Sequence, residues 1–314
     1  MIETYIVTGG AGFIGSHIVE RLLREGHRVR VIDNFSTGKR ENLASFSGNL
    51  EVHEVSITDR DAIAPVFRGV DYVFHEAALA SVPRSVANPL ATNETNITGT
   101  LNVLLAARDS GVKRVVYAAS SSAYGDVEAE AQVETMPPNP VSPYGVSKLA
   151  GEFYCKAFTQ VYGLETVALR YFNVFGPRQD ETSEYAAVIP KFISAMMANR
   201  PPTIYGDGNQ SRDFTYVDNA VHGNMLAVKA PGVAGEVMNL AVGGSVSLLE
   251  LVEKLNRLLG TALQPLHAPA RVGDIRFSQA DVNKAVELLD FAPVASFDTG
   301  LARTIEWFKT RQKV

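Results

Sequence analysis

Short apolar strands alternate with amphipathic helical segments through the first half of the chain, and this alternation limits the fold more than any other feature. The strand-like stretches are TYIVTGG, RVRVIDNF, LEVHEVSI, VDYVFHEAA and KRVVYAASS. Helical patterns such as GSHIVERLLREGH and TGTLNVLLAARDSG lie between them. A strand, a helix and another strand in succession predict a parallel sheet with helices on both faces. We therefore expect an α/β fold with a doubly wound parallel sheet of the Rossmann type in residues 1–175.

The second half of the chain is richer in loops and carries several arginines in stretches such as GDGNQSRDF and HAPARVGD. We expect residues 176–314 to form mainly a smaller α/β lobe that binds the substrate. The stretch GEVMNLAVGG reads as a strand, so a segment near 214–245 is expected to return to the main sheet.

Composition excludes several classes of function. The formal net charge of −5 argues against broad binding to nucleic acid or to anionic membranes. Cys155 is the only cysteine, which rules out an internal disulfide and argues against a thiolate metal site. The sequence starts in an apolar strand without a basic leader and has no run long enough to cross a membrane. We expect a cytoplasmic protein without a metal.

A glycine-rich turn, VTGGAGFIGSH, joins the first strand to the first helix. Gly9, Gly12 and Gly15 would allow a tight turn, a close approach of the backbone to a pyrophosphate, and close packing of the helix on the strand. Asp33 ends the second strand, where an acid can bond a ribose 2′-hydroxyl. Either feature alone could be a simple turn, but together they predict a dinucleotide site that favours NAD over NADP.

Tyr144 and Lys148 lie four residues apart in SPYGVSKLAGEFY, with Ser142 as a helix cap and Pro143 at the first helical position. An ammonium on the same helix face as a tyrosine would stabilise the phenolate. A pair with this spacing also arises by chance on solvated helices. Serines at the end of a strand, Ser120 to Ser122, strengthen the catalytic interpretation, although such a cluster can also be a polar turn.

The motifs TGGAGFIGSH, HEAA, SSSAYGD, SPYGVSK and RYFNVFGPRQ together resemble the extended short-chain dehydrogenase/reductase family over nearly the whole chain. Within the family the chain is similar to the UDP-hexose 4-epimerases. The resemblance implies that Ser120, Tyr144 and Lys148 are catalytic. It also implies that Tyr144 takes the proton of the sugar 4-hydroxyl while a hydride moves from C4 to NAD, and that a transient 4-keto sugar receives the hydride back on its other face.

The resemblance further implies the ligand contacts. Those for NAD are Gly9, Gly12, Phe13, Ile14, Gly15, Asp33, Asn34, Ser36, Gly38, Ser56, Ile57, Ala77, Ala78, Asn96, Tyr144, Lys148 and Tyr171. Those for a UDP-sugar are Ser81, Ser120, Ser122, Tyr144, Asn173, Ala187, Val188, Lys191, Tyr205, Arg212, Arg271, Asp274 and Ser278. The chain departs from many relatives at Ser56, where they carry an aspartate, and this departure predicts weaker bonding to the adenine amino group.

Three residues bear on the reaction. Related 4,6-dehydratases carry Asp and Glu where this chain has Ser121 and Ser122, which argues against dehydration. Ser278 is small at a position that is bulky in epimerases restricted to unacetylated sugars, which favours UDP-GlcNAc and UDP-GalNAc, with UDP-glucose and UDP-galactose also accepted. A nucleotide-sugar reductase, a dehydratase and a non-catalytic dinucleotide sensor stay as alternatives. The family resemblance also implies a homodimer.

Overall fold

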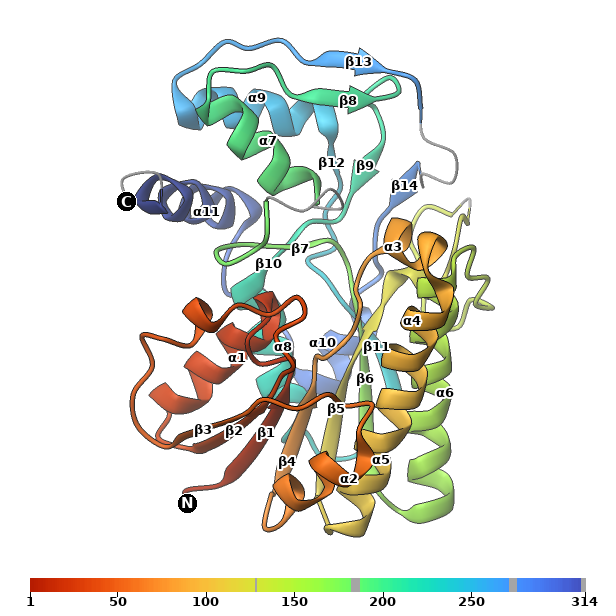
Figure 1. The fold of residues 1–314 in the computed structure, drawn as a ribbon. Helices are drawn as coiled ribbons and strands as arrows, with labels where there is room; N and C mark the ends of the chain where they lie inside the picture. Colours follow the sequence, from red (N-terminus) through yellow and green to blue (C-terminus); the bar gives the residue numbers. More distant parts are fainter. Residues whose placement is uncertain (128, 182–186, 271–275, 312–314) are drawn as a thin grey trace.

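Seven parallel strands form the central sheet of the protein in a computed structural model, which describes residues 1–127, 129–181, 187–270 and 276–311 (Figure 1). The strand order is β11-β6-β5-β4-β1-β2-β3. The strands are β1 (Thr4–Thr8), β2 (Arg28–Ile32), β3 (Leu50–His53), β4 (Tyr72–His75), β5 (Arg114–Ser120), β6 (Glu165–Tyr171) and β11 (Glu236–Leu240). The doubly wound parallel sheet expected from the sequence is confirmed.

The order of the strands reverses between β1 and β4. The chain leaves β1 toward β2 and β3 on one side, and later returns to β4 and β5 on the other side. Open α/β sheets bind ligands at such a reversal, beyond the carboxyl ends of the strands. The glycine turn follows β1 at this edge, and Ser120 and Tyr171 are the last residues of β5 and β6. β3 is shorter than LEVHEVSI predicts, because the chain turns away from the sheet after His53.

Helices cover both faces of the sheet (Figure 1). One face carries α1 (Phe13–Arg24), α8 (Val217–Ala227) and α10 (Asn283–Leu289), and the other carries α2 (Arg60–Ile63), α5 (Gly99–Asp109) and α6 (Pro143–Tyr162). Each face has its own apolar core. Strands buried on both sides explain why their sequences read as continuous apolar runs. No helix in the described ranges is long and apolar enough to span a membrane.

A smaller lobe stands over the carboxyl edge of the sheet (Figure 1). It contains α7 (Val188–Met197), α9 (Leu248–Leu259), β8 (Thr203–Tyr205), β9 (Ser211–Arg212), β12 (Val246–Ser247), β13 (Leu266–Ala268) and β14 (Phe277–Ser278). Further elements are β7 (Val174–Phe175), β10 (Thr215–Tyr216), α3 (Val82–Ala87), α4 (Pro89–Asn93), a π-helical turn (Glu94–Thr98) and α11 (Phe297–Arg311).

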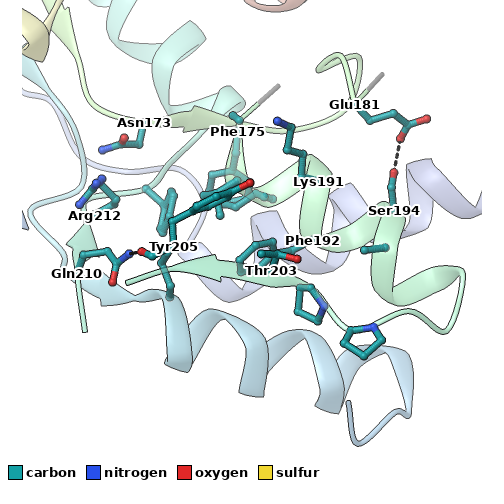
Figure 2. A pocket seen from close by; sticks show the side chains of 18 of the residues that line it. Asn173, Phe175, Glu181, Lys191, Phe192, Ser194, Thr203, Tyr205, Gln210 and Arg212 are labelled. Atoms are coloured by element: carbon teal, nitrogen blue, oxygen red, sulfur yellow. Dashed lines mark hydrogen bonds between the residues drawn. The ribbon is translucent and has the colours of Figure 1, made fainter. Parts of the chain in front are cut away.

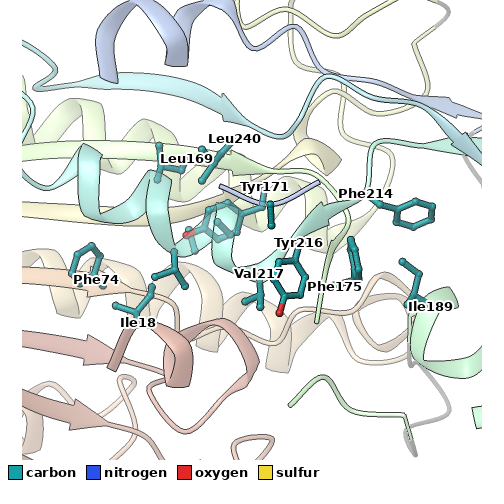
Figure 3. Packing of buried hydrophobic residues seen from close by; sticks show 14 of the residues in the cluster. Ile18, Phe74, Leu169, Tyr171, Phe175, Ile189, Phe214, Tyr216, Val217 and Leu240 are labelled. Atoms are coloured by element: carbon teal, nitrogen blue, oxygen red, sulfur yellow. The ribbon is translucent and has the colours of Figure 1, made fainter. Parts of the chain in front are cut away.

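The lobe and the sheet share one apolar core. Ile18 and Phe74 belong to the sheet domain, and they lie in the same buried cluster as Phe214 and Ile189 of the lobe (Figure 3). β11 comes from the second half of the sequence but belongs to the main sheet, where it pairs with β6 along its whole length. The lobe is therefore packed firmly on the sheet, and a domain boundary at residue 175 stays a prediction.

The long helix α6 lies unusually close to β5. Ser142 caps its first turn by accepting from the Gly145 backbone, and Pro143 follows at the first helical position, as the sequence predicts. A Cβ added at Gly151 would lie 2.2 Å from the Tyr117 hydroxyl, and one at Gly145 would lie 2.6 Å from the Ser122 carbonyl oxygen. These two glycines therefore set the depth at which the helix packs.

A buried ion pair fixes the middle of α6 against β6. Arg170 donates to both carboxylate oxygens of Glu152 at 2.9 and 2.7 Å, and its guanidinium lies 4.5 Å from the ring centre of Tyr124. Both charged side chains are almost fully buried. If α6 slid along β6, the two charges would separate, and each would be left buried without compensation. The pair therefore holds the helix at one position.

We predict that Gly151→Ala destabilises the protein even though alanine is the better helix former. The added methyl group would push α6 away from Tyr117, and overpacking of this kind costs roughly 1–3 kcal/mol. Urea unfolding measures the change, with Glu253→Ala on the exposed side of α9 as the control. An unfolding free energy equal to or above that of the wild type would show that the contact does not limit the packing of α6.

Candidate active site

A cavity of about 400 Å³ lies at the carboxyl ends of β1, β2 and β4. Its walls include most of the residues that the sequence predicts for NAD: Gly9, Gly12, Phe13, Ile14, Gly15, Asp33, Asn34, Ser36, Gly38, Ser56, Ile57, Ala77 and Ala78. These residues come from four separate stretches of the sequence, which the sheet brings together.

The glycine turn fits an anion at the start of α1. Gly9 has a φ of +67°, and a Cβ there would lie 2.8 Å from the backbone of Ala77. A Cβ at Gly15 would lie 2.2 Å from the Gly9 carbonyl oxygen, so the helix packs tightly on the turn. No side chain caps the N-terminus of α1. Its free N–H groups and its dipole are therefore available to a pyrophosphate.

Asp33 is held rigidly at the far end of the same cavity. Its carboxylate accepts hydrogen bonds from the backbone of Ala11 at 2.9 Å and of Phe35 at 2.8 Å. Burial raises the pKa of this carboxyl group, and the two backbone hydrogen bonds oppose the rise. Gly38 packs so closely that a Cβ would lie 2.8 Å from both carboxylate oxygens. This cradle suits the hydroxyls of a ribose and disfavours a 2′-phosphate.

Four predicted cofactor residues are not among the walls of this cavity: Asn96, Tyr171, and Tyr144 and Lys148 of α6, which are described below. The Asn96 amide bonds the backbone of Leu79 and donates to the Ser147 hydroxyl at 2.9 Å, so it joins a cavity-lining loop to α6. Tyr171 donates its hydroxyl to Glu76 at 2.8 Å and accepts from Asn224 at 2.7 Å. Neither side chain is among the cavity walls, and we interpret both as supports.

The proposed catalytic hydroxyls meet where β5 ends and α6 begins. Ser120 caps the short turn after β5, and its hydroxyl lies 3.1 Å from that of Ser122. The side chain of Ser120 lies near enough to the Tyr144 phenol to affect its pKa. Burial raises the pKa of Tyr144, while Ser120 favours the phenolate and the negative charge of Glu76 disfavours it. In the chain alone Tyr144 is therefore a protonated phenol near neutral pH.

Lys148 lies one turn further along α6 and is buried. Its Nζ donates to the Ala118 carbonyl oxygen at 2.8 Å and lies 5.1 Å from the ring centre of Tyr117. Burial lowers the pKa of this ammonium, and nearby acids, first among them Glu76, oppose the change. The spacing of four residues puts Tyr144 and Lys148 one helical turn apart on α6. Lys148 also has partners that the sequence does not reveal.

A second and larger cavity, of about 1350 Å³, opens in the lobe and is large enough for a nucleotide sugar (Figure 2). Its walls include the predicted substrate residues Asn173, Ala187, Val188, Lys191, Tyr205 and Arg212. Ala187 lines both cavities, so the two cavities adjoin. The predicted substrate residue Ser81 lines the first cavity. Ser278 is buried on β14 and is paired in register with Arg212. Arg271 and Asp274 lie outside the described residues.

The structure adds residues that the sequence analysis did not identify. Glu76 directly follows β4 and lines the first cavity. Lys39 lies on one side of that cavity and bonds Asp180 on the other at 3.2 Å. Gln210 lines the larger cavity and donates to the Tyr205 carbonyl oxygen at 2.6 Å. An acid immediately after a buried strand was a usable signal for Glu76. In the described ranges no group of His, Cys, Asp and Glu could hold a metal ion.

Comparison with known proteins agrees with this geometry. The sequence profile of the NAD dependent epimerase/dehydratase family matches residues 5–241. A UDP-glucose 4-epimerase from Mycolicibacterium smegmatis is 38% identical over 313 residues, which cover 98% of this chain and 99% of the relative.

Two solved structures are also very similar. A UDP-N-acetylglucosamine 4-epimerase from Methanobrevibacter ruminantium, in complex with UDP-N-acetylmuramic acid, is 42% identical with a TM-score of 0.95. The alignment covers 99% of this chain and all of that one. A UDP-glucose 4-epimerase from Thermus thermophilus, in complex with NAD, is 37% identical with a TM-score of 0.89, and 98% of this chain and 99% of that one are covered.

The profile match spans more than half of the chain, the relatives align from end to end, and the glycine turn and Asp33 form a cavity that fits NAD. The chain therefore belongs to the NAD-dependent epimerase/dehydratase family of extended short-chain dehydrogenases/reductases, whose UDP-sugar 4-epimerases are its relatives.

Proposed function

We propose that this enzyme inverts the configuration at C4 of a UDP-sugar through a transient 4-keto sugar. The observation that carries the proposal is the position of Tyr144, which starts α6 beside the turn of Ser120 and whose backbone N–H donates to Ser85 of α3 at 3.1 Å. In the same helix α3, Pro83 lines the larger cavity and Arg84 lines the first one. A sugar held in the lobe by groups such as Arg212 and Tyr205 would present its ring to the junction of the two cavities. The similarity to UDP-sugar 4-epimerases supports the same reaction.

Each group has a role that follows from its surroundings. Tyr144 would accept the proton of the sugar 4-hydroxyl and return it after the sugar has turned over. Ser120 lies near the Tyr144 phenol and would orient the sugar oxygen. The buried Lys148 ammonium would stabilise the phenolate by opposite charge. When bound, NAD supplies a hydride acceptor for C4 and a positive charge beside the phenolate.

The protein side chains favour epimerisation over the other reactions of the family. Ser121 and Ser122 follow Ser120 in a short turn, so no acid or base stands directly after the proposed catalytic serine to eliminate water. An epimerase regenerates its cofactor in each cycle, whereas a reductase would need an external hydride donor. The Tyr144–Lys148 pair itself argues against a non-catalytic sensor.

We further propose that the preferred substrates are UDP-GlcNAc and UDP-GalNAc, with UDP-glucose and UDP-galactose also accepted. Ser278 carries this proposal, because it is small and lies beside Arg212 in the lobe. The similarity to a UDP-N-acetylglucosamine 4-epimerase supports it. A cytoplasmic location stays a prediction from the sequence.

A homodimer is also proposed. α4, the π-helical turn and α5 run together beside α6, and this face exposes apolar side chains such as Leu90, Val146 and Phe153. Leu90 lies on α4 and is 81% exposed, and Phe153 lies on α6 and is 59% exposed. Burying large apolar side chains from two copies would stabilise a symmetric contact.

We predict that Tyr144→Phe lowers kcat by roughly 10²–10⁴-fold, since general acid–base catalysis contributes about this much. Binding of NAD should persist, because the glycine turn and Asp33, which form the cofactor cavity, are unchanged. Isothermal titration with NAD and turnover of a UDP-sugar measure the two effects. Tyr72→Phe, at the opposite end of β4, is the control. Undiminished turnover in Tyr144→Phe would contradict the proposed mechanism.

We predict that the wild-type enzyme converts UDP-GlcNAc at least as fast as UDP-glucose, followed by proton NMR of the anomeric signals. Ser278→Tyr should slow turnover of the acetylated sugar at least tenfold more than that of UDP-glucose, because the bulky ring removes space at C2. Conversion of UDP-glucose alone by the wild type would refute the substrate preference and leave the reaction intact.

We predict that Phe153→Glu combined with Leu90→Glu yields a monomer, because two charges would enter an apolar contact. Sedimentation equilibrium measures the mass, and Glu253→Ala on α9 is the control. A wild-type protein that is monomeric at micromolar concentration would contradict the proposed dimer.

A further inference from the structure

Glu76 is an acid in the site to which neither the proposed mechanism nor the cofactor contacts give a role. Its backbone N–H donates to the Thr8 carbonyl oxygen at 3.2 Å, and the next residue donates to the Thr8 hydroxyl. Gly9 packs directly against the same segment. The residue is therefore held at the point where β1 and β4 end, which is also the reversal of the strand order.

The side chain of Glu76 has a defined direction. Tyr171 donates to its Oε1 at 2.8 Å, and Asn224 of α8 donates to the Tyr171 hydroxyl at 2.7 Å. The Asn224 amide also donates to the Ala220 carbonyl oxygen, so the whole chain of hydrogen bonds rests on α8. The carboxylate consequently reaches from β4 toward the end of β6.

Lys148 approaches the same edge from the other face of the sheet. Its Nζ is bonded to the carbonyl oxygen of Ala118, the residue after Tyr117. Tyr117 is paired in register with His75, and Glu76 directly follows His75. Glu76 and Ala118 therefore follow paired residues of neighbouring strands, so the carboxylate and the lysine ammonium lie at the same end of the sheet, although the described residues show no direct ion pair between them.

Other charges around Lys148 are already neutralised or absent. Glu152 lies one turn along α6, but both of its oxygens are bonded to Arg170. Cys155 is a buried thiol whose pKa is raised by burial, so it carries no charge near neutral pH. His75 lies between the hydroxyls of Thr8 and Thr100, and burial lowers its pKa to about 3, which leaves it neutral.

We propose that Glu76 is the counter-ion of Lys148, a positioning residue that keeps this buried ammonium charged while Tyr171 and Asn224 hold the carboxylate in place. The groups that face Glu76 are Lys148 and Tyr144 from α6 and Tyr171 from β6. Burial raises the pKa of Glu76 and lowers that of Lys148, and the attraction between the two opposes both changes. The proposal rests on the proposed role of Lys148 in epimerisation.

The test is the titration of Lys148 in NAD-loaded protein labelled with ¹³C-lysine, with Lys148→Met identifying the signal. Glu76→Gln keeps the shape and the acceptor for Tyr171 but removes the charge. We expect Lys148 to lose its proton at a pH lower by about one unit, which is a tenfold loss of proton affinity. Glu76→Asp, which keeps the charge, should restore most of the difference. Glu165→Gln, at the opposite end of the sheet, is the control.

Activity gives a second readout. The alkaline limb of the kcat profile should move to lower pH in Glu76→Gln, because Lys148 would discharge earlier. A merely structural role would lower kcat equally at all pH values and leave the lysine titration unchanged, and either result would overturn the proposal. Since the titration needs no substrate, it stands even if the proposed epimerase reaction fails.

A reciprocal measurement covers the case in which Glu76→Gln does not fold. If the two groups interact, replacing Lys148 must change the proton affinity of Glu76 by the same factor. In Lys148→Met protein labelled with ¹³C-glutamate, Glu76 should therefore titrate about one pH unit higher than in the wild type. An unchanged Glu76 titration would overturn the proposal.

Discussion

The close contact between α6 and β5 is the constraint on which the proposed catalytic groups depend. The helix carries Tyr144 and Lys148, while the strand ends in Ser120 and supplies the Ala118 carbonyl oxygen that Lys148 bonds. Tyr144 comes within reach of Ser120 only if the helix lies at one depth. Glycine at two positions of α6 permits that depth, and the buried pair of Glu152 and Arg170 prevents the helix from sliding.

Burial acts against charge throughout this site. It raises the pKa of Tyr144 and lowers that of Lys148, so both neutral forms are favoured unless a partner compensates. The compensation is local, because Ser120 favours the phenolate and the acids near Lys148 favour the ammonium. A group that must take a proton and later return it needs such compensation, because the raised pKa of Tyr144 by itself favours the protonated phenol.

Much of the fold and of the cofactor site could be predicted from local sequence patterns. The alternation of strands and helices indicated the parallel sheet, and the glycine spacing indicated a cavity whose geometry needs glycine at Gly9 and Gly15. Asp33 and the Tyr144–Lys148 pair were identified because their positions relative to a strand end or a helix start are local properties. Glu76 was missed, because its partners Tyr171 and Lys148 come from distant parts of the sequence. Asn96 and Tyr171 were predicted as cofactor contacts, but their hydrogen bonds to Ser147 and Glu76 could not be predicted, since those partners also lie far away in the sequence.

The sequence by itself determined the class of fold, the glycine turn of the cofactor cavity and the choice of the proposed catalytic side chains, since these depend on spacings of a few residues. Only the tertiary structure decided which carboxylate faces Lys148, how Ser278 comes to lie beside Arg212, and how the cofactor cavity adjoins the one in the lobe. The physical reason is that strand order and helix depth bring together residues separated by tens to hundreds of positions. Those contacts form because apolar surface is buried along the whole chain, so a pattern of a few neighbouring residues cannot predict them.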